Sequence, residues 1–290
     1  MQKIRTVAVF PTMLTLGNLI CGFFAIVVAS RVGAATPNPI PPSPHLELRN
    51  PAELVAELDP NDPTHNIMAS GLLIFLAMIF DALDGHVARL VRITSDFGAQ
   101  LDSLCDLVTF GVAPAFLMVK MCPDFAYFAR FAVWGIAASF TACAAIRLAR
   151  FNVETEKDDD HLSFIGLPSP AAAGSIASFA ILFYTLRVAT NQWSAAADID
   201  WYMRRFLPAF TLALGALMVS RIPYPHVVNQ LLSGQRSLGH VLALLFSVVV
   251  IIAFQGYSVP IVCSIFVLGP PLRYAFQRWR NRQQDSEPLF

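Results

Sequence analysis

Four aspartates stand at the ends of two apolar segments in the first half of the chain. Asp81 and Asp84 are three residues apart and Asp102 and Asp106 are four apart, so each pair shares one face of a helix. Carboxylates that face one another repel unless cations lie between them, and oxygen ligands suit hard divalent ions such as Mg²⁺. Two such ions can clamp a phosphoryl group during an in-line displacement. The pattern therefore predicts metal-assisted chemistry on a phosphate ester.

Small and basic residues accompany the first pair of aspartates. Gly85 follows Asp84 directly and has no side chain, and Ala88 keeps the same face small about one turn later. Arg89 provides a planar fork that matches a phosphate group. Together these residues predict a slot in which a nucleotide diphosphate lies against the end of the helix.

The whole pattern, D-x2-D-G-x2-A-R-x8-G-x3-D-x3-D from Asp81 to Asp106, resembles the signature of the CDP-alcohol phosphotransferases. The resemblance implies a two-metal site holding Mg²⁺ or Mn²⁺, with Asp81, Asp84 and Asp102 as ligands. It implies that Asp106 is both a ligand and the catalytic base that takes the proton from the attacking alcohol. It also implies a binding site for the cytidine nucleotide and its pyrophosphate. The residues expected to line that site are Thr15, Asn18, Gly85, Ala88, Arg89, Ser95 and Gly98.

Beyond this motif, the chain resembles the bacterial and archaeal phosphatidylserine synthases of the same superfamily. The segments that carry this second resemblance are residues 15–23, 110–116, 147–152 and 163–174. It implies transfer of the phosphatidyl group from CDP-diacylglycerol to the hydroxyl of L-serine with release of CMP, commonly by a homodimer. Glycerol 3-phosphate, inositol phosphate and choline are the alternative acceptors. Outside enzymes, the alternative is a membrane transporter, which the position of the aspartates at helix ends disfavours.

Three polar residues follow the fourth apolar segment on the same side of the membrane as the motif. Arg147 and Arg150 are three residues apart on one helical face, and Asn152 follows them. Arginine matches the geometry of both phosphate and carboxylate, so these residues are candidates for binding a phosphate or the acceptor. The alternative is that the two arginines only anchor the helix at the cytoplasmic interface.

The composition is that of an integral membrane protein. Of the 290 residues, 56% are hydrophobic and 14% are charged, whereas a soluble domain usually carries about a quarter charged residues. The formal net charge is zero, so nothing indicates a nucleic-acid partner. We therefore expect an all-α protein embedded in the lipid bilayer.

The apolar runs predict eight transmembrane helices. The first six form a catalytic core within residues 1–221, and the expected spans are 10–30, 66–88, 97–119, 126–148, 167–187 and 205–221. Residues 241–272 carry no charge but are too long for one span of about 20 residues, and Gly256 and Pro260 divide them. Residues 222–277 thus supply two further helices, and 278–290 form a cytoplasmic tail. Residues 32–65 contain eight prolines and are expected to form a hydrophilic insertion on the non-cytoplasmic side.

The distribution of lysine and arginine predicts the orientation in the cell membrane. With both termini in the cytoplasm, 13 of the 20 basic residues lie on the cytoplasmic side. These residues are Lys3, Arg5, Arg89, Arg92, Arg147, Arg150, Lys157, Arg221, Arg236, Arg273, Arg278, Arg280 and Arg282. The aspartate motif is therefore expected to face the cytoplasm, where nucleotide-activated substrates are made.

Overall fold

The computed structural model describes residues 9–33, 62–91, 96–122, 130–155, 163–189, 195–225, 256–274, 276–278 and 280. Three expectations fall outside these residues: most of the proline-rich insertion, the predicted seventh span before residue 256, and the tail beyond residue 280.

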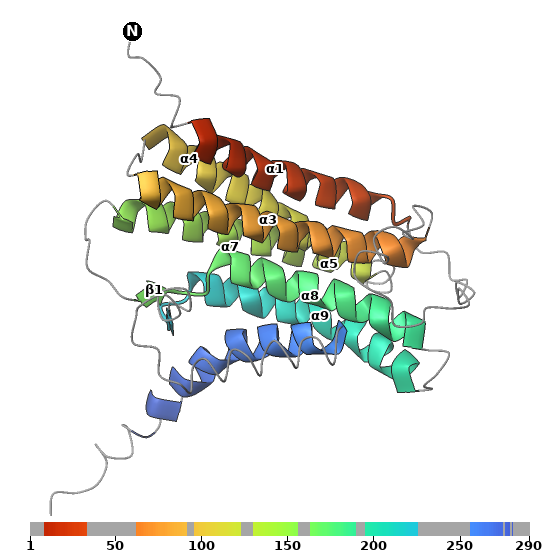
Figure 1. Ribbon diagram of the computed structural model, residues 1–290. Helices are drawn as coiled ribbons and strands as arrows, with labels where there is room; N and C mark the ends of the chain where they lie inside the picture. Colours follow the sequence, from red (N-terminus) through yellow and green to blue (C-terminus); the bar gives the residue numbers. More distant parts are fainter. Residues whose placement is uncertain are drawn as a thin grey trace, which may run out of the picture.

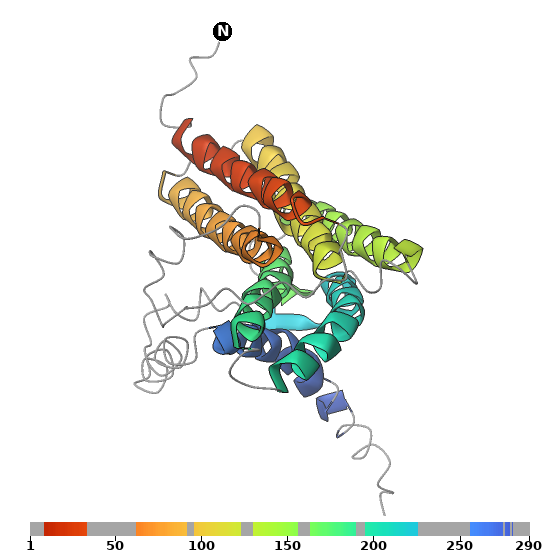
Figure 2. The same ribbon diagram turned by 90° about the vertical axis from the view of Figure 1, so that its right-hand side faces the viewer.

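The described chain is a bundle of long helices that run back and forth, with both motif halves at one end (Figures 1 and 2). Chain reversals between long apolar helices place their sequential neighbours side by side, as in other up-and-down bundles. The described helices before the C-terminal one are α1 (Val9–Ser30), α3 (Pro63–Val91), α4 (Asp96–Asp106), the π-helix η2 (Leu107–Val112), α5 (Ala113–Met121), α7 (Arg130–Thr155), α8 (Ser169–Ala189) and α9 (Ala195–Val219).

Within the described residues, six helical segments are long and apolar enough to cross a membrane, which confirms an all-α, multi-pass membrane fold. They overlap predicted spans one to five and eight. Their bounds are Thr12–Ser30, Pro63–Val87, Phe97–Met121, Phe131–Val153, Ser169–Arg187 and Gly256–Arg278. The predicted sixth span, 205–221, corresponds to the C-terminal part of α9. That helix is not among the six because Arg204 and Arg205 precede its apolar stretch.

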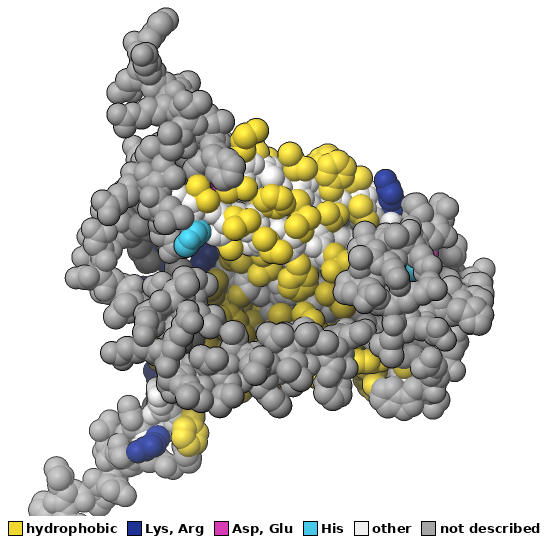
Figure 3. Space-filling view, in the orientation of Figure 1, with side chains coloured by type: hydrophobic (Ala, Val, Ile, Leu, Met, Phe, Trp, Pro, Cys, Tyr) yellow, Lys and Arg dark blue, Asp and Glu magenta, His cyan; other side chains and the backbone are white. Residues whose placement is uncertain are grey.

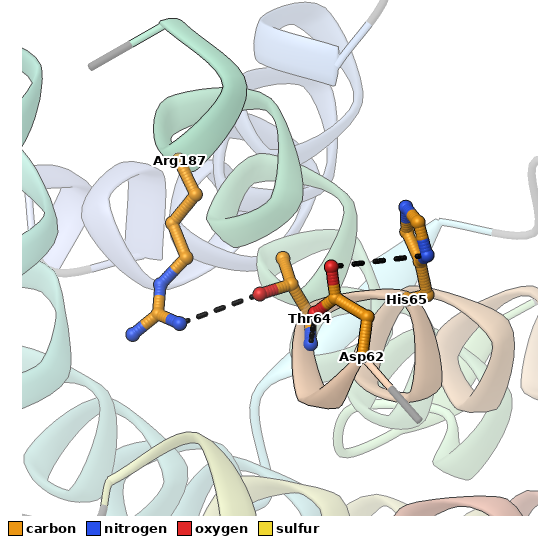
Figure 4. A network of polar contacts seen from close by, with 4 residues as sticks. All are labelled: Asp62, Thr64, His65 and Arg187. Carbon is orange, nitrogen blue, oxygen red and sulfur yellow. Dashed lines mark hydrogen bonds and ion pairs between the residues drawn. The ribbon is translucent and has the colours of Figure 1, made fainter. Parts of the chain in front are cut away.

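Helix α3 begins three residues before the predicted second span, because Asp62 caps it. The backbone N–H of Thr64 donates to Asp62 Oδ1 over 2.7 Å, and Pro63 suits the first turn, where no intrahelical N–H bond is made. At this end, opposite the aspartate motif, Arg187 Nη1 donates to Thr64 Oγ1 over 3.3 Å (Figure 4). His65 Nδ1 lies 3.9 Å from Asp62 Oδ2. This network joins the start of α3 to the end of α8.

Small residues let the central helices approach closely. A Cβ atom added at Gly71 of α3 would lie 2.9 Å from the backbone oxygen of Ala177 in α8. Ser70 Oγ donates to the backbone oxygen of Ala25 over 2.9 Å and so joins α3 to α1. Such close contacts between small residues are typical of helices that pack within a membrane. The outer face over α1 and α3 is covered by hydrophobic side chains (Figure 3).

A short β-ribbon closes the aspartate end of the α8–α9 pair. Strands β1 (Ser163–Ile165) and β2 (Pro223–Pro225) pair antiparallel, with Phe164 opposite Tyr224. The Tyr224 hydroxyl donates to the backbone oxygen of Val267 over 3.0 Å and thereby joins the ribbon to the C-terminal helix, Gly256–Arg278. Burial raises the pKa of Tyr224 to about 12, so its hydroxyl keeps the proton that it donates.

Candidate active site

The structure brings the two halves of the aspartate motif together. Asp81 lies on the last turns of α3, and Asp102 and Asp106 lie on α4. One carboxylate oxygen from each of these three residues lies within 4.8 Å of the other two. The chain reversal between α3 and α4 therefore creates the convergence of carboxylates that the spacing predicts. Such a group of oxygen ligands can hold a divalent metal ion.

Asp84 lies beside this cluster but is not part of the group of three. Its side chain is 5% exposed and accepts a hydrogen bond from the hydroxyl of Thr15 on α1. Asp84 Oδ2 and Asp102 Oδ1 are buried and have no hydrogen-bond partner among the described residues. A buried carboxylate oxygen without a donor is costly unless a cation satisfies it. The donor set and these two oxygens thus fit a divalent cation.

Asp106 is held by a hydrogen bond from Asn18 of α1. The Nδ2 atom of Asn18 donates to Asp106 Oδ1 over 2.9 Å, and both side chains are buried. The backbone oxygen of Asn18 in turn accepts a bond from Thr109 Oγ1 at 3.2 Å. The sequence placed Asn18 in the nucleotide site, and the described structure shows that its amide contacts the predicted base directly. An amide in an apolar helix needs such a partner.

A π-helical turn follows Asp106 directly and was not predicted. It places Gly111 against α7, where Thr141 Oγ1 donates to the Gly111 backbone oxygen over 3.3 Å. On the α1 side, a Cβ atom at Gly22 would lie 2.8 Å from the Cα atom of Thr109. Single π-turns inside helices often occur at functional sites. Gly22 and Gly111 lie in the segments that carry the resemblance to the phosphatidylserine synthases, 15–23 and 110–116, and both are also candidates for helix packing.

Arg147 of α7 is a buried basic residue whose charge is felt by the cluster. Its side chain is 8% exposed, and its charge interacts with Asp81 and Asp106. Its Nη1 atom donates to Ser169 Oγ over 2.8 Å, whereas Nε has no partner among the described residues. Arg147 is thus the predicted acceptor residue that the structure places next to the carboxylates. Ser169 was missed, because Pro168 and Pro170 identified only the start of a helix.

The other two candidate acceptor residues form hydrogen bonds with other helices. Arg150 Nη1 donates to the backbone oxygen of Val219 at the end of α9, over 3.3 Å. Asn152 Nδ2 donates to the hydroxyl of Ser103, the residue after Asp102, over 3.0 Å. These bonds tie the end of α7 to α9 and to α4. Their part in binding an acceptor stays a prediction.

The remaining predicted nucleotide residues border the motif. A Cβ atom at Gly85 would meet no atom of the described residues within 4 Å, so these residues leave space beside Asp84. Gly98 is partly exposed in the first turn of α4. The side chains of Ala88 and Arg89, and the whole of Ser95, lie outside the described residues.

Comparison with known proteins gives matches that include this site. The profile of the CDP-alcohol phosphatidyltransferase family matches residues 8–217. A CDP-diacylglycerol–serine O-phosphatidyltransferase of Helicobacter pylori is 39% identical over 159 residues, which are 53% of this chain and 59% of that protein. The enzyme of the same name from Methanocaldococcus jannaschii is 38% identical over 57% of this chain and 68% of its own length. The match therefore spans less than two thirds of the Helicobacter protein.

The relative of that name from Bacillus subtilis is matched over a larger part of its length. It is 32% identical over 216 residues, 74% of this chain and 89% of the relative. The matched family region, residues 8–217, contains all four motif aspartates, Asn18 and Arg147. With the helical bundle and the convergent carboxylates, these matches establish that the chain belongs to the CDP-alcohol phosphatidyltransferase family.

Proposed function

We propose that this protein transfers the phosphatidyl group of CDP-diacylglycerol to the hydroxyl of L-serine and releases CMP. The observation that carries the proposal is the convergence of Asp81, Asp102 and Asp106 within 4.8 Å, in a chain whose relatives are named for this reaction. The reaction forms a bond between the serine oxygen and phosphorus and breaks the bond from phosphorus to the CMP oxygen. The hydroxyl proton must go to a base.

The residues around the cluster have the properties that this reaction needs. Asp81, Asp84, Asp102 and Asp106 would hold two Mg²⁺ or Mn²⁺ ions, which when bound neutralise charge on the phosphoryl oxygens. Asp106 would take the serine proton as the new bond forms. The Asn18 amide fixes one oxygen of Asp106 and leaves the other for a metal or the proton. The open space beside Gly85 would admit the nucleotide diphosphate.

Arg147 is the residue that we assign to the acceptor. It is buried beside Asp81 and Asp106, and its guanidinium keeps donors beyond the one that Ser169 accepts. These donors suit the carboxylate of serine, which lies a few bonds from the hydroxyl that reacts. Arg150 and Asn152 would support this part of the site through the ends of α7, α9 and α4.

The site would face the cytoplasm of a cell membrane, and the enzyme would be a homodimer. The distribution of basic residues supports the orientation, because Arg147 and Arg150 lie in the last third of α7, Arg221 follows the end of α9, and Arg273 lies near the end of the C-terminal helix. Lipid tails would then enter from the bilayer, while the nucleotide and serine come from the cytoplasmic side.

A direct assay tests the proposal. Purified protein in mixed micelles would receive CDP-diacylglycerol, Mg²⁺ or Mn²⁺ and one alcohol at a time, with released CMP and the lipid product both identified. We expect phosphatidylserine and an equal amount of CMP with serine. If glycerol 3-phosphate serves as well as serine, the proposed acceptor is wrong. Full activity after exhaustive chelation would contradict the metal-dependent mechanism.

A further inference from the structure

The hydroxyl of Ser169 contacts Arg147, whose charge interacts with Asp81 and Asp106 of the aspartate cluster. Ser169 is fully buried as the first residue of α8, and Arg147 comes from the last third of α7. The 2.8 Å bond from Arg147 Nη1 to Ser169 Oγ is the contact between their side chains. A long arginine side chain otherwise has many rotamers, so this bond selects one of them.

The backbone around Ser169 is itself held in place. Gly166 adopts a φ of +87°, and a Cβ atom there would lie 3.0 Å from the Ser220 backbone oxygen, so the position requires glycine. Gly166 N–H donates to the Ile222 oxygen over 2.9 Å, and Leu167 N–H donates to the Leu217 oxygen over 3.1 Å. Two backbone bonds, one to the last turn of α9 and one to the residue before β2, thus fix the segment that leads into Ser169.

We propose that Ser169 is a positioning residue: its hydroxyl holds the Arg147 guanidinium in the orientation that binds the acceptor beside Asp106. This inference rests on the proposed function. Without the Ser169 acceptor, the charge of Arg147 remains, but its direction is no longer fixed. Pre-organisation of this kind lowers the cost of binding a substrate group in the reactive geometry. The serine hydroxyl therefore acts through the arginine and does not touch the reacting atoms.

The test is a double-mutant cycle with steady-state kinetics. Ser169→Ala should raise the KM for the acceptor about tenfold, within the range for losing a hydrogen bond to a charged group, and change the KM for CDP-diacylglycerol little. Arg147→Ala should raise the acceptor KM at least as much. The double variant should be no worse than Arg147→Ala alone, because Ser169 has nothing left to position. Ser169→Thr, which keeps the hydroxyl, should restore most of the wild-type KM.

Two further variants separate positioning from packing. Ser175→Ala removes an equally buried hydroxyl of α8 that donates to the Ala171 oxygen over 2.8 Å, and it should leave the acceptor KM unchanged. Ser169→Cys keeps the volume of the side chain but is a weak hydrogen-bond acceptor, so it should raise the acceptor KM about as much as Ser169→Ala. It provides the same test if the alanine variant folds poorly. Equal effects of Ser169→Ala and Ser175→Ala would overturn the proposal. Full additivity of Ser169→Ala with Arg147→Ala would do the same.

The two proposals fail in different ways. The wild-type protein alone decides whether serine is the acceptor, and the cycle is measured with whichever alcohol the wild-type protein uses. If serine is not the acceptor but the double-mutant cycle is non-additive, Ser169 still positions Arg147. A serine-specific enzyme with an additive cycle would instead show that Ser169 only packs the start of α8.

Discussion

At the scale of single residues, Asp106 is held by the side-chain amide of Asn18 on α1. Its carboxylate receives the Asn18 amide at 2.9 Å, whereas buried oxygens of Asp84 and Asp102 have no hydrogen-bond partner among the described residues. A hydrogen bond from a neutral donor fixes the orientation of a carboxylate and does not neutralise its charge, as a salt bridge would. Such an arrangement suits a base, while the bare oxygens suit metal ligands.

Asp106→Asn should therefore abolish turnover and leave the fold intact. Asparagine keeps the shape of the side chain but can neither accept the proton nor carry the charge. We expect the transfer rate to fall by about 10²–10⁴, the usual contribution of general acid–base catalysis. Thermal unfolding of the purified variant, followed alongside the rate, checks that the bundle is retained. Residual activity above about a tenth of the wild-type rate would exclude Asp106 as the base.

Asp102→Asn tests the metal site independently of turnover. The change removes one charge from a group whose oxygens lie within 4.8 Å of one another, so Mn²⁺ should bind more weakly. Mn²⁺ binding can be followed by electron paramagnetic resonance of the free ion, with Asp198→Asn as the control. Asp198 is an exposed aspartate in the first turn of α9, and its variant should bind Mn²⁺ as the wild type does. Unchanged Mn²⁺ affinity in Asp102→Asn would argue against the metal-ligand assignment.

At the scale of elements, the contact between α1 and η2 sets the position of Asn18. Gly22 lies one turn after Asn18 and faces Thr109, whose hydroxyl bonds the Asn18 backbone oxygen. The backbone of the π-turn lies close to α1 at Thr109, so only glycine fits at position 22 opposite it. The contact between α1 and η2 contains none of the motif aspartates, yet it determines where Asn18 holds the base, Asp106.

Gly22→Ala should move α1 away from η2. The new Cβ atom would lie 2.8 Å from the Thr109 Cα atom, which is backbone and cannot rotate aside. We expect a loss of about 1–3 kcal/mol in stability, as for other overpacked sites, together with a lower transfer rate. Gly135→Ala is the matched control, because no described residue lies within 4 Å of a Cβ atom at that position on α7. Thermal unfolding in detergent compares the two, and equal behaviour would show that the α1–η2 contact is unimportant.

Much of this arrangement could be predicted, because membrane spans and motif spacing are local signals. The convergence of Asp81 with Asp102 and Asp106 followed from one short chain reversal between two spans. The roles of Ser169 and Thr109 could not be predicted, since each depends on a partner from another helix, 22 residues away for Ser169 and 91 for Thr109. The start of α3 was misplaced for a different reason. Asp62 and Pro63 form a helix cap, but they were read as part of the proline-rich loop.

At the scale of the whole molecule, the C-terminal helix is attached outside the family region. The family match ends at residue 217. The helix Gly256–Arg278 contacts α8 and also Tyr224, which follows the matched region. A Cβ atom at Gly256 would overlap the Thr185 side chain, so the helix begins in close contact with α8. The Tyr224 bond to Val267 secures its middle. The aspartate cluster contains no residue from this helix.

Tyr224→Phe should loosen the C-terminal helix without altering the site. Phenylalanine keeps the buried ring and leaves the Val267 oxygen without its donor, which costs about 1 kcal/mol. We expect a lower unfolding temperature and an unchanged acceptor KM. Tyr202→Phe, at a side chain that is 67% exposed, should change neither. A large fall in transfer rate for Tyr224→Phe would mean that the C-terminal helix supports the site after all.

The backbone bonds of Gly166 and Leu167 also impose an order on biosynthesis. Their acceptors, Ile222 and Leu217, are synthesised more than 100 residues after Asp106, the last residue of the aspartate motif. The first spans can insert and bring the carboxylates together while the rest of the chain is still being translated. The two backbone bonds that fix the segment before Ser169 cannot form until α9 has been synthesised and has returned to the same end of the bundle. A nascent chain thus acquires its acidic cluster early and the fixed orientation of Arg147 late, so half-made protein would have the cluster before it has a complete acceptor site.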